Sequence, residues 1–248
     1  MTLTSPPSYT LKMEESLAAS PAWELLHGAD RLLTEVIAGR DLLRHWMRLG
    51  VTMAACAAVY GAVLGLWHGP RLAAFDALKL PLVLLLTSAL TVGFAWTAAA
   101  ALGLPLRFGQ VAVLTFLALT VASVLLASLA PVAWFFTLSA PIPTPEARTA
   151  HNLLYLLHTA FVGACGLAGT VALWKAMRRL DAPLGTLRAV YAVWVAAFAL
   201  VGSEVAWALR PFVGSVYMPV VFLRPDALEG NVYEFIFTDI LPHFVSWL

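Results

Sequence analysis

Long apolar runs separated by short polar connections organise the chain from Leu49 onward. Each run has about the 20 residues that a helix needs to cross a hydrocarbon core. Backbone groups in lipid must satisfy their own hydrogen bonds, and the runs lack the period-two alternation of barrel strands. The pattern predicts an all-α, polytopic membrane helix bundle of about five transmembrane helices, at residues 49–67, 80–102, 108–130, 152–174 and 188–209.

Prolines mark several junctions, because a missing amide donor costs little at a helix end. We expect these prolines at or near span ends: Pro70, Pro81, Pro105, Pro131, Pro183 and Pro211. The third run continues past Pro131 to Leu138. It either overshoots the membrane or ends in a short interfacial or re-entrant piece that puts Trp134 and Phe136 at headgroup depth.

The segment 1–48 has a different pattern, in which apolar residues recur with a 3.6-residue period from Leu25 to Met47. Ser20 and Pro21 form a plausible helix start, and charged residues occupy the opposite face. The segment lacks the apolar core of a secretory signal. It predicts an N-terminal amphipathic helix that lies on the membrane surface, on the ends of the spans, or against a partner.

Composition agrees with a membrane protein, since 61% of the residues are hydrophobic and 12% are charged. The net charge of +1 gives no basic face for nucleic acid, so nucleic acid is not an expected partner. Cys56 and Cys165 fall inside apolar runs, and we expect packed thiols rather than a disulfide.

Lysine and arginine counts predict the orientation, because cations are retained on the cytoplasmic side. With the N-terminus inside, nine cations lie on the inner segments and five on the outer ones. The inner set is Arg31, Arg40, Arg44, Arg48, Arg107, Lys175, Arg178, Arg179 and Arg188; the outer set is Arg71, Lys79, Arg148, Arg210 and Arg224. A cytoplasmic N-terminus and an extracytoplasmic C-terminus follow.

This orientation places several polar residues near the outer leaflet, namely Glu204, His158, His151, Lys79 and Arg210. His151 and His158 are two turns apart on one helical face, and a protonated histidine could pair with Glu204. Arg210 does not share the face of Glu204, so its expected partner is another carboxylate such as Asp76 or Glu229. The cluster is either a polar knot that pins the helix ends or an ion or proton pathway.

Small residues recur every fourth position in two spans and allow close approach of backbones. They are Ala57, Gly61 and Gly65 in the first span, and Ala160, Ala164 and Ala168 in the fourth. Both stripes fit intramolecular packing and oligomerisation equally well.

Motifs for catalysis are not found in the sequence. The six histidines lack metal-ligand spacing, and no nucleophile elbow, P-loop or dinucleotide fingerprint is present. Haem ligation by His151 or His158 is disfavoured, because both lie on one helix. We therefore expect no metal, no cofactor and no enzymatic activity.

Residues 210–248 form an aromatic tail outside the predicted 49–209 bundle. Asn231, followed three residues later by Glu234, suggests a helix from Asn231 to Leu241. So dense an aromatic surface should cover the bundle ends or bind a partner.

The tail motif resembles an uncharacterised group of bacterial five-helix integral membrane proteins. The residues that carry the resemblance are 202–204, Gly-Ser-Glu; 207–214, Trp-Ala-Leu-Arg-Pro-Phe-Val-Gly; 222–224, Phe-Leu-Arg; and 230–234, Gly-Asn-Val-Tyr-Glu. The five-helix arrangement with an inner N-terminus is also similar to Yip1-like proteins in topology. The resemblance implies a multi-pass protein of a bacterial inner membrane and no reaction.

Two functions remain as expectations. The first is a non-enzymatic membrane scaffold or accessory subunit of a membrane complex, which binds membrane protein partners or a second copy through its tail and N-terminal helix. The second is a homo-oligomeric channel or small transporter that uses Glu204 and His158. The sequence has no inverted repeat, which disfavours an ordinary secondary transporter.

Overall fold

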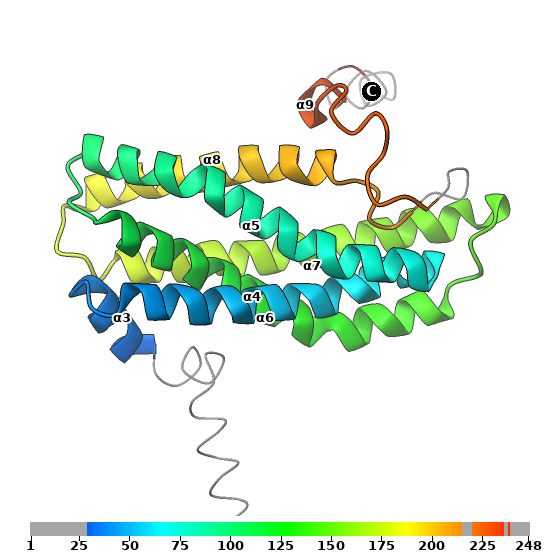
Figure 1. Cartoon of the computed structure of the whole chain (residues 1–248), viewed down its shortest axis with the longest axis horizontal. Coiled ribbons are helices and arrows are strands. Elements are labelled where there is room, and N and C mark those ends of the chain that lie inside the picture. Colours follow the sequence, from blue (N-terminus) through cyan, green and yellow to red (C-terminus); the bar gives the residue numbers. More distant parts are fainter. Residues whose placement is uncertain (1–28, 215–219, 236–237, 239–248) are drawn as a thin grey trace, which may run out of the picture.

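The computed structural model describes residues 29–214, 220–235 and 238, and every regular element among them is a helix (Figure 1). Five of these helices are long and apolar enough to cross a membrane, so the fold class predicted from the sequence is confirmed. The elements are α3 (Ala29–Ile37), α4 (Leu42–Gly65), η1 (Leu66–His68), α5 (Pro70–Ala101), α6 (Phe108–Ser139), η2 (Pro145–Ala147), α7 (Arg148–Met177), α8 (Leu184–Ala208) and α9 (Val232–Phe235).

Two of the spanning helices continue through prolines that were expected at their ends. Pro81 lies inside α5 and Pro131 inside α6. Membrane helices tolerate interior proline, because neighbouring groups satisfy the freed backbone carbonyl. The re-entrant alternative after Pro131 is therefore wrong: Trp134 and Phe136 lie on the exposed side of an unbroken 32-residue helix. At 1.5 Å per residue this helix is about 48 Å long, which exceeds a core of about 30 Å.

The N-terminal amphipathic helix is shorter than expected. It ends at Ile37, and the chain turns through Gly39 and Asp41, whose φ angles are +70° and +49°. Leu43 and Met47, assigned to this helix from periodicity, instead begin α4. Residues before Ala29, including the predicted start at Ser20, lie outside the described residues.

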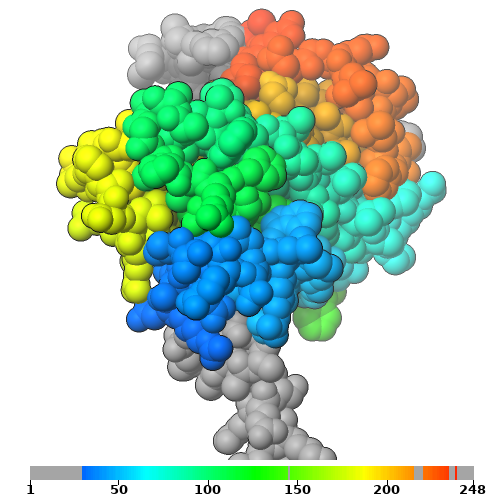
Figure 2. Space-filling view, turned by 60° about the vertical axis from the view of Figure 1, so that its left-hand side comes forward, coloured from blue at the N-terminus to red at the C-terminus, as the bar shows by residue number. Residues whose placement is uncertain are grey.

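The apolar face of α3 packs on the ends of the spans. Leu32, Leu33 and Val36 are buried in the same core as Leu114 of α6. Figure 2 faces this end of the bundle, where α3, the connection from α5 to α6 and the connection from α7 to α8 lie together. We call it the α3-side end. The opposite end holds η1, the start of α7 and residues 210–214, and we call it the tail-side end.

The bundle is asymmetric around α6. Helices α4 and α7 pack on α6, whereas α5 packs on α4 and α8. In the most apolar window of α6, 67% of the residues are buried, against 22% in α7 and 17% in α8. Few contacts join α7 to α8. These two helices therefore leave most of their surface for lipid or a partner.

The tail leaves α8 and returns over the tail-side end before α9 begins (Figure 1). Asn231 accepts a hydrogen bond of 2.8 Å from the Glu234 amide, as expected for a residue that caps a helix. The structure describes α9 as Val232–Phe235; the rest of the predicted helix falls largely outside the described residues. Cys56 and Cys165 are free thiols, and Cys165 is buried.

Candidate functional site

A buried ion pair lies on α5 near the tail-side end. Asp76 and Lys79 are one turn apart, both side chains have no exposed surface, and Lys79 Nζ is 3.7 Å from Asp76 Oδ1. Within the part of the chain that the structure describes, neither carboxylate oxygen of Asp76 has a hydrogen-bond partner. A buried charge costs several kcal/mol to desolvate, so each member of the pair depends on the other.

The small residues of α4 make room for this pair. A Cβ atom added to Gly65 would stand 2.6 Å from both Asp76 Oδ2 and the Leu72 carbonyl oxygen. One added to Gly61 would overlap the Asp76 carbonyl, and Ala57 is fully buried on the same stripe. The Ala57, Gly61 and Gly65 stripe thus lies at the contact between α4 and α5.

Lys79 also holds the start of the tail. Its ammonium donates a hydrogen bond of 2.7 Å to the carbonyl of Pro211. It lies 5.6 Å from the centre of the Phe212 ring and 5.5 Å from that of Phe222, distances at which a cation attracts an aromatic face. Phe222 in turn packs edge-on against Phe75 of α5. One buried cation therefore joins two parts of the tail to α5.

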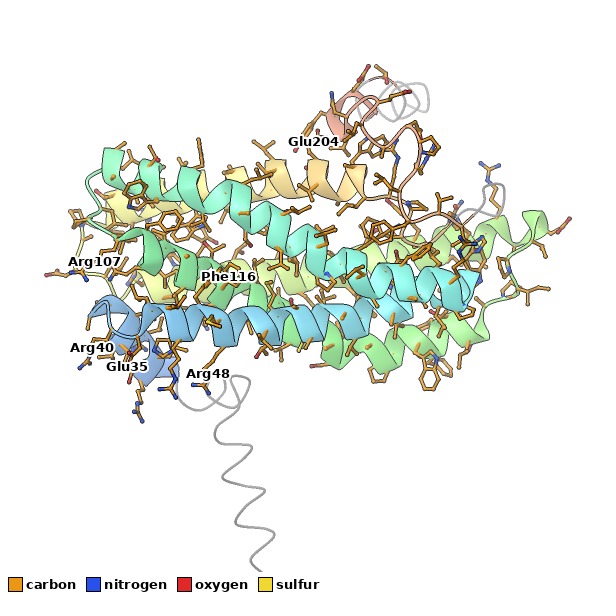
Figure 3. The ribbon with its side chains drawn as sticks, viewed as in Figure 1. Glu35, Arg40, Arg48, Arg107, Phe116 and Glu204 are labelled. Carbon is orange, nitrogen blue, oxygen red and sulfur yellow. The ribbon has the colours of Figure 1, made fainter. Side chains whose placement is uncertain are left out.

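Glu204 lies at the last turns of α8, below the tail (Figure 3). Its Oε2 atom accepts a hydrogen bond of 3.4 Å from the Val232 amide. The neighbouring Ser203 hydroxyl is 2.6 Å from the hydroxyl of Tyr233. Glu204 therefore contacts the start of α9 rather than a histidine.

Arg210 stacks on Trp207, with the guanidinium carbon 3.8 Å from the ring centre, and donates to the Trp207 carbonyl over 2.9 Å. Among the described residues, Arg210 forms an ion pair with Asp226, at 3.7 Å. The expected partners Asp76 and Glu229 are therefore wrong. Asp226 is also bound by Arg224, and burial together with this second guanidinium lowers the pKa of Arg210.

The two histidines of α7 have different partners. The hydroxyl of Tyr60 and His158 Nδ1 are joined by a hydrogen bond of 2.8 Å, buried between α4 and α7. His151 Nε2 donates to the Gly214 carbonyl over 2.9 Å, and its ring lies 5.5 Å from that of Trp67. His158 thus joins two helices, and His151 holds the tail.

The five predicted polar residues do not converge on one point. Lys79, His151, Glu204 and Arg210 each contact residues 207–232, whereas His158 contacts α4. The arrangement is a set of separate contacts between the tail and the helices. Sequence reasoning missed the Asp76–Lys79 pair because the second span was expected to start at residue 80. Pro70 directly after Gly69, a typical helix start, was the available signal.

A second group of polar contacts fixes α3 at the other end. The Gln110 side-chain amide donates to the carbonyls of Val36 and Ile37 over 3.0 and 2.9 Å and accepts from the Arg107 amide over 2.8 Å. The bond to Ile37 satisfies a carbonyl that the helix end leaves free, whereas the Val36 carbonyl also accepts from the Gly39 amide over 3.0 Å. Sequence reasoning did not identify Gln110, because its partners on α3 are more than 70 residues away.

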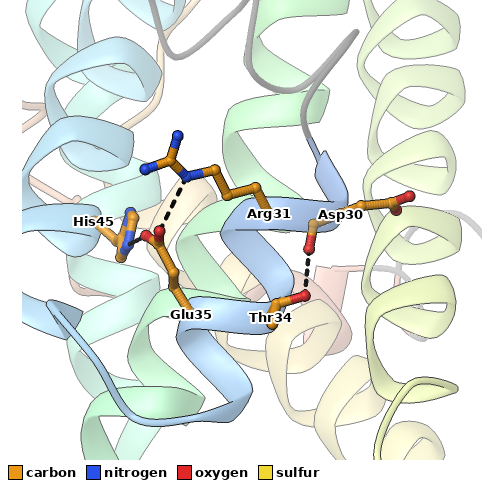
Figure 4. Close-up of polar contacts among 5 residues, drawn as sticks. All are labelled: Asp30, Arg31, Thr34, Glu35 and His45. Carbon is orange, nitrogen blue, oxygen red and sulfur yellow. Dashed lines mark hydrogen bonds and ion pairs between the residues drawn. The ribbon is translucent and has the colours of Figure 1, made fainter.

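Glu35 links α3 to α4 (Figure 4). It accepts hydrogen bonds from Arg31 at 3.1 Å and from His45 at 2.9 Å. The Arg31 guanidinium holds the pKa of Glu35 below its ordinary value; burial opposes it as the next largest effect, and the His45 ring lowers the pKa further. Arg40, Arg48 and Arg107 lie at the same end of the bundle (Figure 3).

The second small-residue stripe does not pack inside the chain. Ala160 and Ala164 are exposed, and Ala168 is half-buried. The close approach to α6 uses Gly169 instead, where an added Cβ would stand 2.6 Å from the Ala118 carbonyl oxygen. The intramolecular interpretation of Ala160 and Ala164 is therefore wrong, because α7 turns its other side toward α6.

Neither a metal-ligand cluster among the described residues nor a match to a known protein assigns a function to this site. Within the described residues, no three His, Cys, Asp or Glu side chains come together as metal ligands. Searches against protein-family models, curated proteins and solved structures find no match to this chain.

Proposed function

We propose that this chain is a non-enzymatic scaffold or accessory subunit of a membrane complex, which binds a transmembrane helix of a partner along one face of α7. The partner face consists of Ala160, Gly163 and Ala164. All three are exposed, and nothing lies within 4 Å of a Cβ atom added to Gly163. This open face of small residues is the observation that carries the proposal.

Small residues matter here because association of helices in lipid depends on close packing rather than on the hydrophobic effect. The chain already uses the same device internally, where Gly61 and Gly65 bring α4 against α5. The partner face is unused within the described residues. A second copy of this chain or another membrane protein would complete it.

The tail and α3 supply further surfaces for such a complex. The contacts of Lys79, His151 and Glu204 fix the position of the tail over the helix ends. Gln110 and Glu35 do the same for α3. Both elements are therefore presented in a defined orientation, as an accessory subunit requires.

Co-purification from native membranes tests the proposal with two matched variants. Gly163→Leu fills the partner face, whereas Gly166→Leu adds the same side chain to the same helix outside that face. Neither position has a neighbour within 4 Å of an added Cβ. We expect Gly163→Leu to remove the co-purifying partner, or the second copy, while Gly166→Leu retains it. Equal recovery with both variants would contradict the proposal.

The alternative is a homo-oligomeric channel or small transporter that uses Glu204 and His158. Glu204 contacts the Val232 amide and His158 contacts Tyr60, so no described contact joins them along one path. Reconstitution into vesicles separates the two functions. Ion flux through the wild-type protein that Glu204→Gln abolishes would favour the channel. Absence of ion flux through the wild-type protein would favour the scaffold.

We also propose a bacterial inner-membrane location with the α3-side end in the cytoplasm. Seven of the nine cations assigned to that side belong to elements or connections at the α3-side end: Arg31, Arg40, Arg44, Arg107, Lys175, Arg178 and Arg179. Retention of cations on the cytoplasmic side favours this orientation. Reporter fusions after residues 105 and 181 test it, since both should report cytoplasm; periplasmic activity at both would reverse the orientation.

A further inference from the structure

A furrow runs between α7 and α8, the two spanning helices that barely touch. It consists of two cavities, one of about 420 Å³ at the tail-side end and one of about 160 Å³ toward the α3-side end. Phe198 and Ala199 of α8 line both cavities, so the two meet there. The furrow exists because α7 packs on α6 while α8 packs on α5.

The furrow is longer than one acyl chain of a phospholipid, which occupies a single leaflet. On α7 its walls extend from Tyr155 to Leu173. At 1.5 Å per residue this stretch is about 27 Å, close to the thickness of a whole hydrocarbon core of about 30 Å. An acyl chain of a phospholipid remains in its own leaflet, whereas a longer single chain would follow the furrow across both.

The polar groups of the furrow suit a small uncharged head group. Thr87 lines the larger cavity, has no exposed surface, and its hydroxyl has no hydrogen-bond partner among the described residues. An unsatisfied buried hydroxyl costs about 1–3 kcal/mol, which a ligand oxygen would offset. His158 lines the same cavity. None of the described side chains that line either cavity is cationic, so a phosphate would find no counter-charge.

The tail closes the larger cavity at one end. Phe212 and Val213 line it, and the bond from Lys79 to Pro211 fixes their position. A bulky head group would collide with this segment. The walls otherwise consist mainly of apolar side chains, and the furrow lies between two helices that face the hydrocarbon layer.

We propose that the furrow binds a single-chain isoprenoid lipid whose small head carries a hydroxyl or carbonyl oxygen. The oxygen bonds to Thr87, and the chain lies along α7 and α8 past Phe198 toward Leu173. This site is independent of the scaffold function, because none of the three residues of the partner face lines either cavity. Long-chain quinones and polyprenols share the required chemistry.

Binding to the purified full-length protein tests this site. Three probes are compared by native mass spectrometry in detergent: a long-chain quinone, a polyprenol of similar length, and phosphatidylglycerol. We expect the quinone or the polyprenol to bind and phosphatidylglycerol to bind at least tenfold more weakly. The isoprenoid that binds more tightly identifies the preferred head group. Equal retention of phosphatidylglycerol would overturn the proposal.

Variants then locate the probe. Gly166→Leu and Ala199→Leu place side chains into the furrow from opposite walls, at exposed positions that tolerate them. Each should weaken isoprenoid binding at least tenfold, and Gly163→Leu should not change it. Thr87→Val keeps the shape and removes the hydroxyl, with an expected loss of about fivefold, equivalent to one hydrogen bond of about 1 kcal/mol.

The outcomes separate this site from the scaffold function. A loss of isoprenoid binding in Gly163→Leu as large as in Gly166→Leu would overturn the location in the furrow. Unchanged binding in both Gly166→Leu and Ala199→Leu would do the same. If Gly163→Leu loses the co-purifying partner but still binds the isoprenoid, both proposals are supported. If Gly163→Leu retains the partner, only the scaffold function is rejected.

Discussion

Lys79 of α5 donates a hydrogen bond of 2.7 Å to the carbonyl of Pro211, 132 residues further along the chain. The same ammonium is 3.7 Å from Asp76, and both charged side chains are fully buried. The position of the tail therefore depends on a charge whose own burial depends on a neighbouring carboxylate. This dependence makes the pair a sensitive point of the fold.

Removing one member of the pair should destabilise the protein. Lys79→Met leaves the Asp76 charge buried and unpaired, and breaking such a pair costs about 3–5 kcal/mol. We expect a large drop in the midpoint of thermal unfolding in detergent. The double variant Asp76→Leu/Lys79→Met removes both charges and should recover most of the loss. A double variant as unstable as the single one would show that the tail contact, rather than the unpaired charge, dominates.

Substitution of Gly65 tests the close contact between α4 and α5. Gly65→Ala places a methyl group 2.6 Å from the Leu72 carbonyl, which is backbone and cannot move freely. Overpacking of this kind costs about 1–3 kcal/mol. Gly93→Ala is the matched control, because nothing lies within 4 Å of its added Cβ and alanine favours a helix. Urea or thermal unfolding should show Gly65→Ala less stable and Gly93→Ala unchanged or more stable; equal effects would refute the contact.

The sequence predicted the five spans because each is long, apolar and uncharged over most of its length. It did not predict the pairing of Asp76 with Lys79, because the apolar run from Leu80 concealed ten earlier residues of the same helix. Nor did it predict that Arg210 pairs with Asp226 or that Ala160 faces outward. Periodicity shows which residues share a face of a helix. Which neighbouring helix each face contacts depends on the packing of the whole bundle.

Attachment of α3 should weaken in acid. The pKa of Glu35 is lowered in the folded protein, so its stabilising effect is complete above its unfolded pKa of about 4.3 and is lost as the pH falls through the lower folded value. The protection of residues 29–41 against hydrogen exchange, taken relative to the intrinsic exchange rate at each pH, should therefore fall below about pH 4. Glu35→Gln should remove this acid-dependent change. If the wild type and Glu35→Gln respond identically to acid, another group controls α3.

Gln110 should stabilise the position of α3 more than it stabilises the spanning helices. Gln110→Leu removes the donor to the Ile37 carbonyl and one of two donors to the Val36 carbonyl, which keeps the Gly39 amide, and an unsatisfied buried group costs about 1–3 kcal/mol. We expect faster hydrogen exchange in residues 29–41 and little change in α7. Gln110→Glu keeps the oxygen that accepts from Arg107 but loses the donors, and should behave like Gln110→Leu. Normal protection in both variants would contradict the assigned role.

The partner face of α7 can be tested most directly by photo-crosslinking in native membranes. A photo-reactive amino acid replaces Ala164 in one protein and Gly166 in another, since the first lies on the partner face and the second lines the furrow. We predict a discrete protein adduct from position 164, either with a second copy or with one other membrane protein, and no such adduct from position 166. Lipid adducts alone from both positions would contradict the proposal that α7 binds a partner helix.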